Sequence, residues 1–123
     1  MTIKTRKLLF DAFDSCRAIR RYTDGIDLAA YLRDDMMRDA VERRLGIVGE
    51  ALHRAQALEP TLSDRLPEVG EIVGMRNRII HGYDKVDYDI VWEAVQNRIP
   101  ALQTRLAELL SEHDGPNTPP PHV

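Results

Sequence analysis

The run of residues 75–83 gathers polar side chains of the types that act on phosphodiesters. It carries, in order, Arg76, Asn77, Arg78, His81 and Tyr83. Histidine titrates near neutral pH and can serve as a general base or acid. Arginine stays charged and offers a planar fork to phosphate oxygens. Cleaving RNA without metal needs a base for the ribose 2′-hydroxyl, an acid for the leaving 5′-oxygen and a cation for the phosphorane. Arg76 and His81 are therefore the candidate catalytic residues.

Helical spacing decides which of these side chains can meet. Asn77 and His81 are four residues apart and share a helix face, so Asn77 can hydrogen-bond His81 and orient it. Arg78, three residues before His81, is also its neighbour. Arg76 is five residues before His81, about 140° away around a regular helix, and can reach it from the flank or from a second subunit. A twofold dimer would supply a second copy of every group.

The role of His81 stays open at this point. The C-terminal end of a helix favours a protonated imidazole, which suits an acid or electrostatic role better than that of a base. An equally open interpretation is that Arg76 and His81 only cap and solvate the helix end. The chain has no His or Cys pair with metal-site spacing and no phosphate-binding glycine loop, so no metal or cofactor is expected. The single cysteine, Cys16, falls on an apolar helix face and is expected to be a buried thiol.

The first half of the chain reads as three helices that would position this run. Apolar residues at spacings of three and four predict a helix over 4–22, followed by a turn at 23–25. Asp27 can cap a short second helix, and the third spans about 34–58. Gly46 and Gly49 in this long helix indicate close approach of another helix. Glu50 is either a solvated side chain or a buried polar contact.

The second half is predicted to add two helices. A loop at 61–65 precedes a helix that starts near Pro67 and is capped by Gly82, with a turn at 84–85. Asp87 can cap the last helix, which Pro100 can kink. Tyr88 and Trp92 are expected in the core or an interface. The inward-facing residues of the last helix are expected to be Ile90, Val91, Val95, Ile99, Leu102, Leu106 and Leu110.

Length and composition indicate one all-α domain, a four- to five-helix bundle over 1–113, with a disordered proline-rich tail at 114–123. The net charge of −3 argues against nucleic-acid binding through bulk electrostatics. Local basic groups remain as patches or, alternatively, as solvated helix faces: Arg17, Arg20 and Arg21; Arg38, Arg43 and Arg44; and Arg76 and Arg78. No segment has the length of a membrane span or the pattern of a signal peptide, so a cytoplasmic location is expected.

Four blocks of sequence, in order, carry a family resemblance. The run 75–83 resembles the HEPN signature in its HepT-like form: arginine, four residues, histidine, one residue, tyrosine. The stretches 26–27, 39–51 and 88–92 are similar to the same family, so that the resemblance covers about residues 9–110. The family often has tryptophan before the motif where this chain has Val69, a difference in packing.

The resemblance implies a helical homodimer whose two motifs face each other across the interface. It implies a toxin RNase of a type VII-like toxin–antitoxin pair, with Arg76 and His81 catalytic and Asn77 and Arg78 supporting. The partner would be a minimal nucleotidyltransferase (MntA-type) antitoxin that can transfer AMP to Tyr83. The alternatives are a non-catalytic subunit that binds such a nucleotidyltransferase and assists its substrate recognition, and a plain dimerisation bundle.

Overall fold

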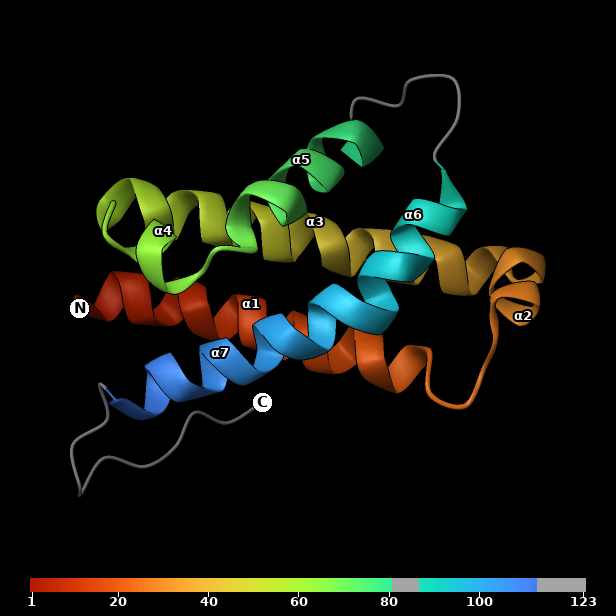
Figure 1. The fold of residues 1–123 in the computed structure, drawn as a ribbon, viewed down its shortest axis with the longest axis horizontal. Coiled ribbons are helices and arrows are strands. Elements are labelled where there is room, and N and C mark those ends of the chain that lie inside the picture. The colour runs from red at the N-terminus through yellow and green to blue at the C-terminus, as the bar shows by residue number, and fades with distance from the viewer. Residues whose placement is uncertain (81–86, 113–123) are drawn as a thin grey trace.

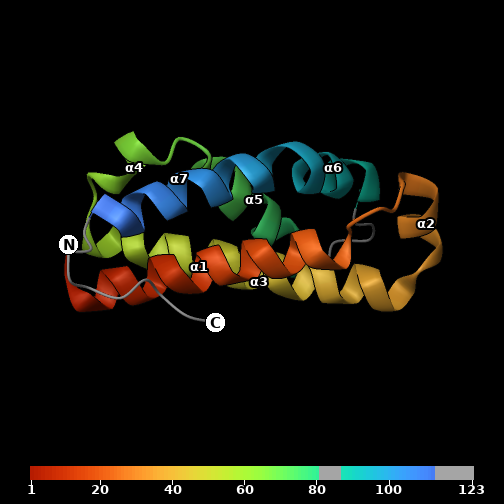
Figure 2. The ribbon, with the colours of Figure 1, turned by 90° about the horizontal axis from the view of Figure 1, so that it is seen from below.

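The computed structural model describes residues 1–80 and 87–112, and this part of the chain is helical, with no strand. This confirms the predicted all-α bundle. Figures 1 and 2 show the two layers, with α1 beside α3 in one layer and α5 beside α6–α7 in the other. The elements are α1 (Ile3–Tyr22), α2 (Leu28–Arg33), α3 (Asp35–Leu58), α4 (Leu62–Arg65), α5 (Val69–Ile80), α6 (Tyr88–Glu93), the π-helical turn η1 (Ala94–Arg98) and α7 (Ile99–Glu112).

Side-chain caps fix where the helices begin, largely as the sequence predicts. Asp27 accepts a hydrogen bond from the Ala30 amide at the start of α2, and Asp87 caps α6 in the same way. Asp34 caps α3. These contacts satisfy amide groups that have no partner within the helix. The predicted turn after α1 is confirmed, with Gly25 at a φ of 74° that favours glycine.

The core lies between the two layers. Its largest side chains with almost no exposure come from every main helix: Leu9, Ile19, Tyr31, Val41, Leu45, Val48, Leu52, Leu66, Ile72, Ile99, Leu102 and Leu106. Tyr31 packs against Tyr88 and Trp92, with ring centroids 6.4 and 5.1 Å away. This confirms that Tyr88 and Trp92 serve packing. Burial raises the pKa of Tyr31, so its hydroxyl stays protonated.

Three predictions about the second half need correction. The expected loop at 61–65 contains the helical turn α4, because Leu62 and Leu66 are both buried and a turn brings them to the core. Helix α5 begins at Val69, two residues after Pro67. Ile90 is exposed and not part of the core, although the other six predicted residues of the last helix are buried.

The expected irregularity near Pro100 takes the form of the π-helical turn η1, which ends at Arg98, two residues before the proline. Proline has no amide hydrogen to donate, so the regular hydrogen-bond ladder is interrupted there. Gly82, the turn at 84–85 and the tail at 114–123 lie outside the described residues. Within 1–80 and 87–112, no helix is both long and apolar enough to cross a lipid bilayer.

Candidate active site

Arg76 is held in place by contacts on both sides of its guanidinium. Its Nη2 lies 2.8 Å from Oε2 of Glu50 on α3, and its Nη1 donates to Oδ1 of Asn77 at 2.9 Å. The side chain is only 23% exposed, whereas that of Glu50 is 47% exposed. Arg76 is therefore not a freely solvated residue at a helix end. Glu50 makes a polar contact, but at 47% exposure it is partly exposed and not the buried contact that the sequence offered as one alternative.

Gly49 allows α5 to approach α3 at the level of Arg76. A Cβ atom at Gly49 would lie 2.7 Å from Cβ and 2.8 Å from Cγ of Arg76, closer than such atoms pack. The predicted close approach of another helix is confirmed at this glycine. At Gly46 a Cβ atom would meet nothing within 4 Å, so that within one chain the prediction is wrong there. Gly49 and Glu50 thus act together, one by giving room and the other by holding the charge.

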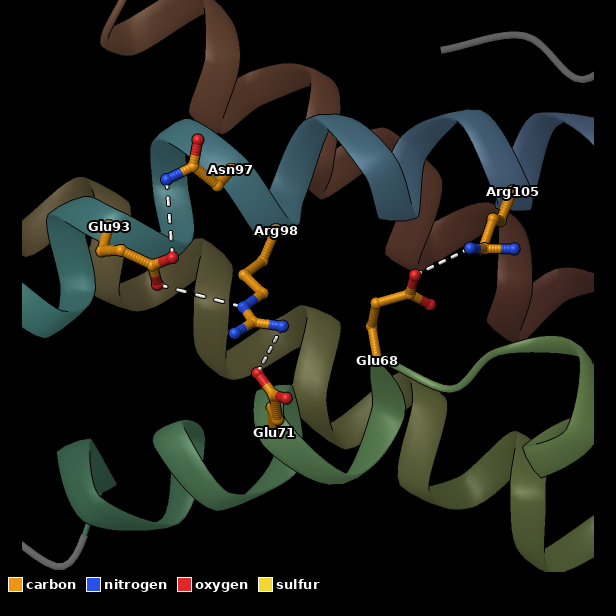
Figure 3. A network of polar contacts seen from close by, with 6 residues as sticks. All are labelled: Glu68, Glu71, Glu93, Asn97, Arg98 and Arg105. Atoms are coloured by element: carbon orange, nitrogen blue, oxygen red, sulfur yellow. Dashed lines mark hydrogen bonds and ion pairs between the residues drawn. The ribbon is translucent and has the colours of Figure 1, made fainter.

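Ion pairs tie α5 to the last helix on its other side. Arg98 of η1 lies 2.8 Å from Glu71 of α5, and Arg105 of α7 lies 2.7 Å from Glu68 just before α5 (Figure 3). Each partly exposed pair contributes little alone, about 0–1 kcal/mol. They connect α5, the helix that carries the motif, to η1 and α7 without reaching Arg76.

The held guanidinium keeps donors for a ligand. An arginine has five N–H groups, and the contacts with Glu50 and Asn77 use two of them. The Nε–H of Arg76 is buried without a hydrogen-bond partner among the described residues. The remaining Nη hydrogens can bind a phosphate oxygen while Glu50 and Asn77 keep the fork in one orientation. Glu50 offsets part of the positive charge, so the site recognises phosphate by directed hydrogen bonds more than by net charge.

The other predicted site residues are placed only in part. Arg78 belongs to α5, and His81 and Tyr83 lie outside the described residues. The Oδ1 atom of Asn77 accepts a hydrogen bond from Arg76. Helical spacing predicted that Asn77 would contact His81, and it did not predict this bond. Glu50 is the contact residue that sequence reasoning failed to assign to the site. The sequence offered two signals for it: the open choice between a solvated and a buried Glu50, and the neighbouring Gly49 as a mark of a second helix nearby.

The basic groups of the first half make separate local contacts. Arg17 pairs with Asp14 at 3.2 Å, and Arg20 donates to Gln103 at 2.9 Å. Arg38 stacks on the ring of Tyr88 at 4.9 Å. Arg17, Arg20 and Arg21 together line one shallow surface hollow with Asp24 and Gln103.

Neither Cys16 nor His53 adds a reactive group to the site. Cys16 is fully buried, as expected, and burial raises the pKa of its thiol to about 12, so that it is no nucleophile. His53 is exposed on α3. Among the described residues, no three histidine, cysteine or acidic side chains are grouped as metal ligands.

Comparison with known proteins decides the family. The profile of the family described as "Ribonuclease HepT-like" matches residues 13–109. The chain belongs to the HepT-like ribonuclease family. It is 31% identical over 100 residues to "Putative RNase MJ1380" of Methanocaldococcus jannaschii, covering 80% of this chain and 89% of that protein. It is 33% identical over 104 residues to "Probable ribonuclease HepT" of Thermococcus cleftensis, covering 82% and 91%. No solved structure gives a significant match.

Membership of the HepT-like family supports a ribonuclease function for this chain. The match spans α1 from Phe13 through most of α7, and so includes the α3–α5 contact that holds Arg76. The motif run therefore lies in a fold whose relatives carry ribonuclease names, and the bundle around it is the part that the comparisons share.

Proposed function

We propose that this HepT-like protein is the toxin of a type VII-like toxin–antitoxin pair. It acts in the cytoplasm as a homodimeric, metal-independent endoribonuclease. The observation that carries the proposal is the guanidinium of Arg76. Glu50 and Asn77 hold it in one orientation and leave some of its N–H groups available to bind a phosphate. Arg76 lies five residues before His81 in the motif of a ribonuclease family.

The proposed reaction is a transesterification at one phosphodiester. The ribose 2′-oxygen loses its proton to a base and attacks phosphorus, and the bond to the 5′-oxygen breaks as that oxygen gains a proton. His81 supplies the imidazole for proton transfer, and Arg76 stabilises the charge on the phosphorane. One histidine cannot readily act as base and acid in one step, so the two copies of the homodimer together provide the groups. Asn77 and Arg78 are the supporting residues of this proposed active site.

The experiment is RNA digestion by the purified protein in excess EDTA. The proposal predicts products that end in 2′,3′-cyclic phosphate and 5′-hydroxyl, and loss of cleavage in His81→Ala at unchanged helical content. Cleavage that stops in EDTA and returns with a divalent cation contradicts the metal-independent mechanism. Undiminished cleavage by the His81→Ala variant removes the proposed role of the histidine.

The antitoxin partner in this proposal is a minimal nucleotidyltransferase that transfers AMP to Tyr83. A phosphate-bearing group two residues from His81 would repel the RNA backbone and engage a nearby arginine. We expect Tyr83→Phe to keep cleavage but to resist the antitoxin, so that it stays toxic on co-expression. Intact-mass measurement checks this, and an AMP adduct on Tyr83→Phe at the wild-type ratio contradicts the assignment.

A second candidate is a non-catalytic subunit that binds a nucleotidyltransferase and assists its substrate recognition. Two observations favour it: the net charge of −3, and the offset of the Arg76 charge by Glu50. The two functions separate cleanly in cells. A toxin arrests growth when expressed alone and is relieved by the antitoxin, whereas an accessory subunit is harmless alone.

A further inference from the structure

A furrow follows the seam between α1 and α7, and Arg20 lies at its centre. Helix α1 packs against α3 and α7, whereas α5 packs against α3, so this seam is on the opposite side of the bundle from the contact that holds Arg76 (Figures 1 and 2). Hollows of about 340, 240 and 430 Å³ share the side chain of Arg20. The central one is lined by Arg17, Arg20, Arg21, Asp24 and Gln103.

The two exposed arginines of this furrow are held in place without being neutralised. Arg20 donates from Nη1 to the uncharged Oε1 of Gln103 at 2.9 Å. The guanidinium of Arg21 lies over the ring of Tyr22, 5.6 Å from its centroid. Neither arginine has an ion pair with a residue that the structure describes. Their charges are therefore available to an anion, in contrast to the paired guanidinium of the candidate active site.

Arg17 extends this group by one helical turn. Its guanidinium lies over the ring of Phe13 at 5.0 Å and pairs with Asp14 at 3.2 Å. Arg17 and Arg21 are four residues apart, so they share one face of α1. A guanidinium that lies over one aromatic ring can stack a nucleobase on its other face, and its N–H edge can bind a phosphate. The furrow thus offers contacts to both parts of a nucleotide.

Acidic side chains determine which part of the furrow suits a phosphate. Asp24 lines the central hollow, and Glu108 lines the hollow toward the end of α7. With Asp14 included, the central hollow has three positive charges and two negative ones, a balance of +1 in a chain whose net charge is −3. The centre, where Arg20 and Arg21 lie, is therefore the favourable place for a phosphate.

We propose that the furrow between α1 and α7 is an RNA-binding surface outside the candidate active site, where Arg17, Arg20 and Arg21 bind the backbone of a single strand. The choice of RNA rests on the proposed function. Glu50 offsets the charge of Arg76, so contacts with other phosphates of the substrate must supply most of the affinity. The strand is single because unstacked bases can reach the guanidinium planes.

The first test measures binding without cleavage. The probe is a labelled single-stranded 2′-O-methyl RNA, which lacks the attacking hydroxyl, and fluorescence anisotropy reports its binding to the full chain at several salt concentrations. Arg20→Gln and Arg21→Gln are each expected to reduce the slope of log Kd against log salt concentration by about 0.7, the contribution of one phosphate contact on a single strand. At about 0.1 M salt that slope corresponds to binding about fivefold weaker.

Arg33→Gln is the matched control for these two variants. It removes the same charge from an exposed arginine in the last turn of α2, outside the furrow. The affinity and the salt slope of this variant are expected to stay close to those of the wild-type chain. Circular dichroism confirms that all three variants keep their helical content.

Gln103→Glu separates RNA binding from a role in the fold. It places a carboxylate beside Arg20 while every arginine of the furrow is retained. Binding of the probe should weaken about as much as in Arg20→Gln, because the charge of Arg20 is then offset. The midpoint of urea unfolding should stay the same or rise, since the substitution adds an exposed ion pair. A purely structural role for this contact would not weaken binding in a variant of unchanged stability.

The RNA-binding surface is overturned if the furrow variants lose no more affinity than Arg33→Gln, or if the wild-type chain does not bind the probe. Cleavage of ordinary RNA is measured separately. There Arg20→Gln should raise KM and leave kcat unchanged, because a remote contact is made equally in the ground state and the transition state. A chain that binds the probe as predicted but cleaves no RNA refutes only the ribonuclease proposal. A chain that cleaves RNA while its furrow variants bind like the wild type refutes only this surface.

Discussion

Arg76→Ala is expected to lower RNA cleavage by about 10²–10³-fold, the usual cost of losing one donor to a developing anion. The variant should remain folded, since its ion pair with Glu50 is partly exposed and contributes about 1 kcal/mol or less. The measurement is the single-turnover cleavage rate at saturating protein, with circular dichroism to check helical content.

Two further substitutions show whether the loss comes from the planar guanidinium, from its charge or from a change in the fold. Arg76→Lys keeps the charge but has no planar fork, so it cannot hold Glu50 and Asn77 while binding phosphate, and most of the loss should persist. Arg98→Ala removes an ion pair of the same 2.8 Å length between η1 and Glu71 of α5, away from the site, and should retain cleavage. Full activity in Arg76→Lys would show that position 76 supplies only charge. Equal losses in Arg76→Ala and Arg98→Ala would show that Arg76 acts through the fold.

Gly49→Ala is expected to destabilise the protein and to impair cleavage together. The added Cβ would lie 2.7 Å from Cβ of Arg76, so α3 and α5 must separate and the guanidinium must move away from Glu50 on α3. Overpacking of this kind costs about 1–3 kcal/mol, and the better helix propensity of alanine returns up to about 1 kcal/mol. The midpoint of urea unfolding and the cleavage rate of the folded protein measure the two effects.

Gly74→Ala is the matched control for this prediction. Gly74 lies in α5, two residues before Arg76, and a Cβ atom there meets nothing within 4 Å. Alanine at this position should therefore stabilise the protein by up to about 1 kcal/mol. If Gly49→Ala proves as stable and as active as Gly74→Ala, the close approach at Gly49 does not position Arg76.

Local patterns in the sequence were sufficient to predict most of the helices. Caps such as Asp27 and Asp87 act within three residues of themselves, so their roles follow from the residues nearby. The turn α4 was missed because one helical turn is too short for a periodic pattern, and only the burial of Leu62 and Leu66 in the finished core explains it.

The candidate site was predictable in its residue types and less so in its contacts. Arg76 stood out by its spacing from His81, a property of one segment of chain. Its pairing with Glu50 joins residues 26 positions apart, and it depends on how α5 crosses α3. Gly49 indicated that two helices meet but not which side chain of the second helix would lie against it.

The central claim is that Arg76 of one chain and His81 of the other act on the same phosphate. The most direct test is to co-express Arg76→Ala and His81→Ala copies with different tags and to purify the mixed dimer through both. The mixed dimer retains an intact arginine on one chain and an intact histidine on the other. It is predicted to cleave RNA well above either variant alone, but more slowly than the wild-type dimer, because only one of the two imidazoles is left. A mixed dimer as inactive as its two parents would contradict a site shared between chains.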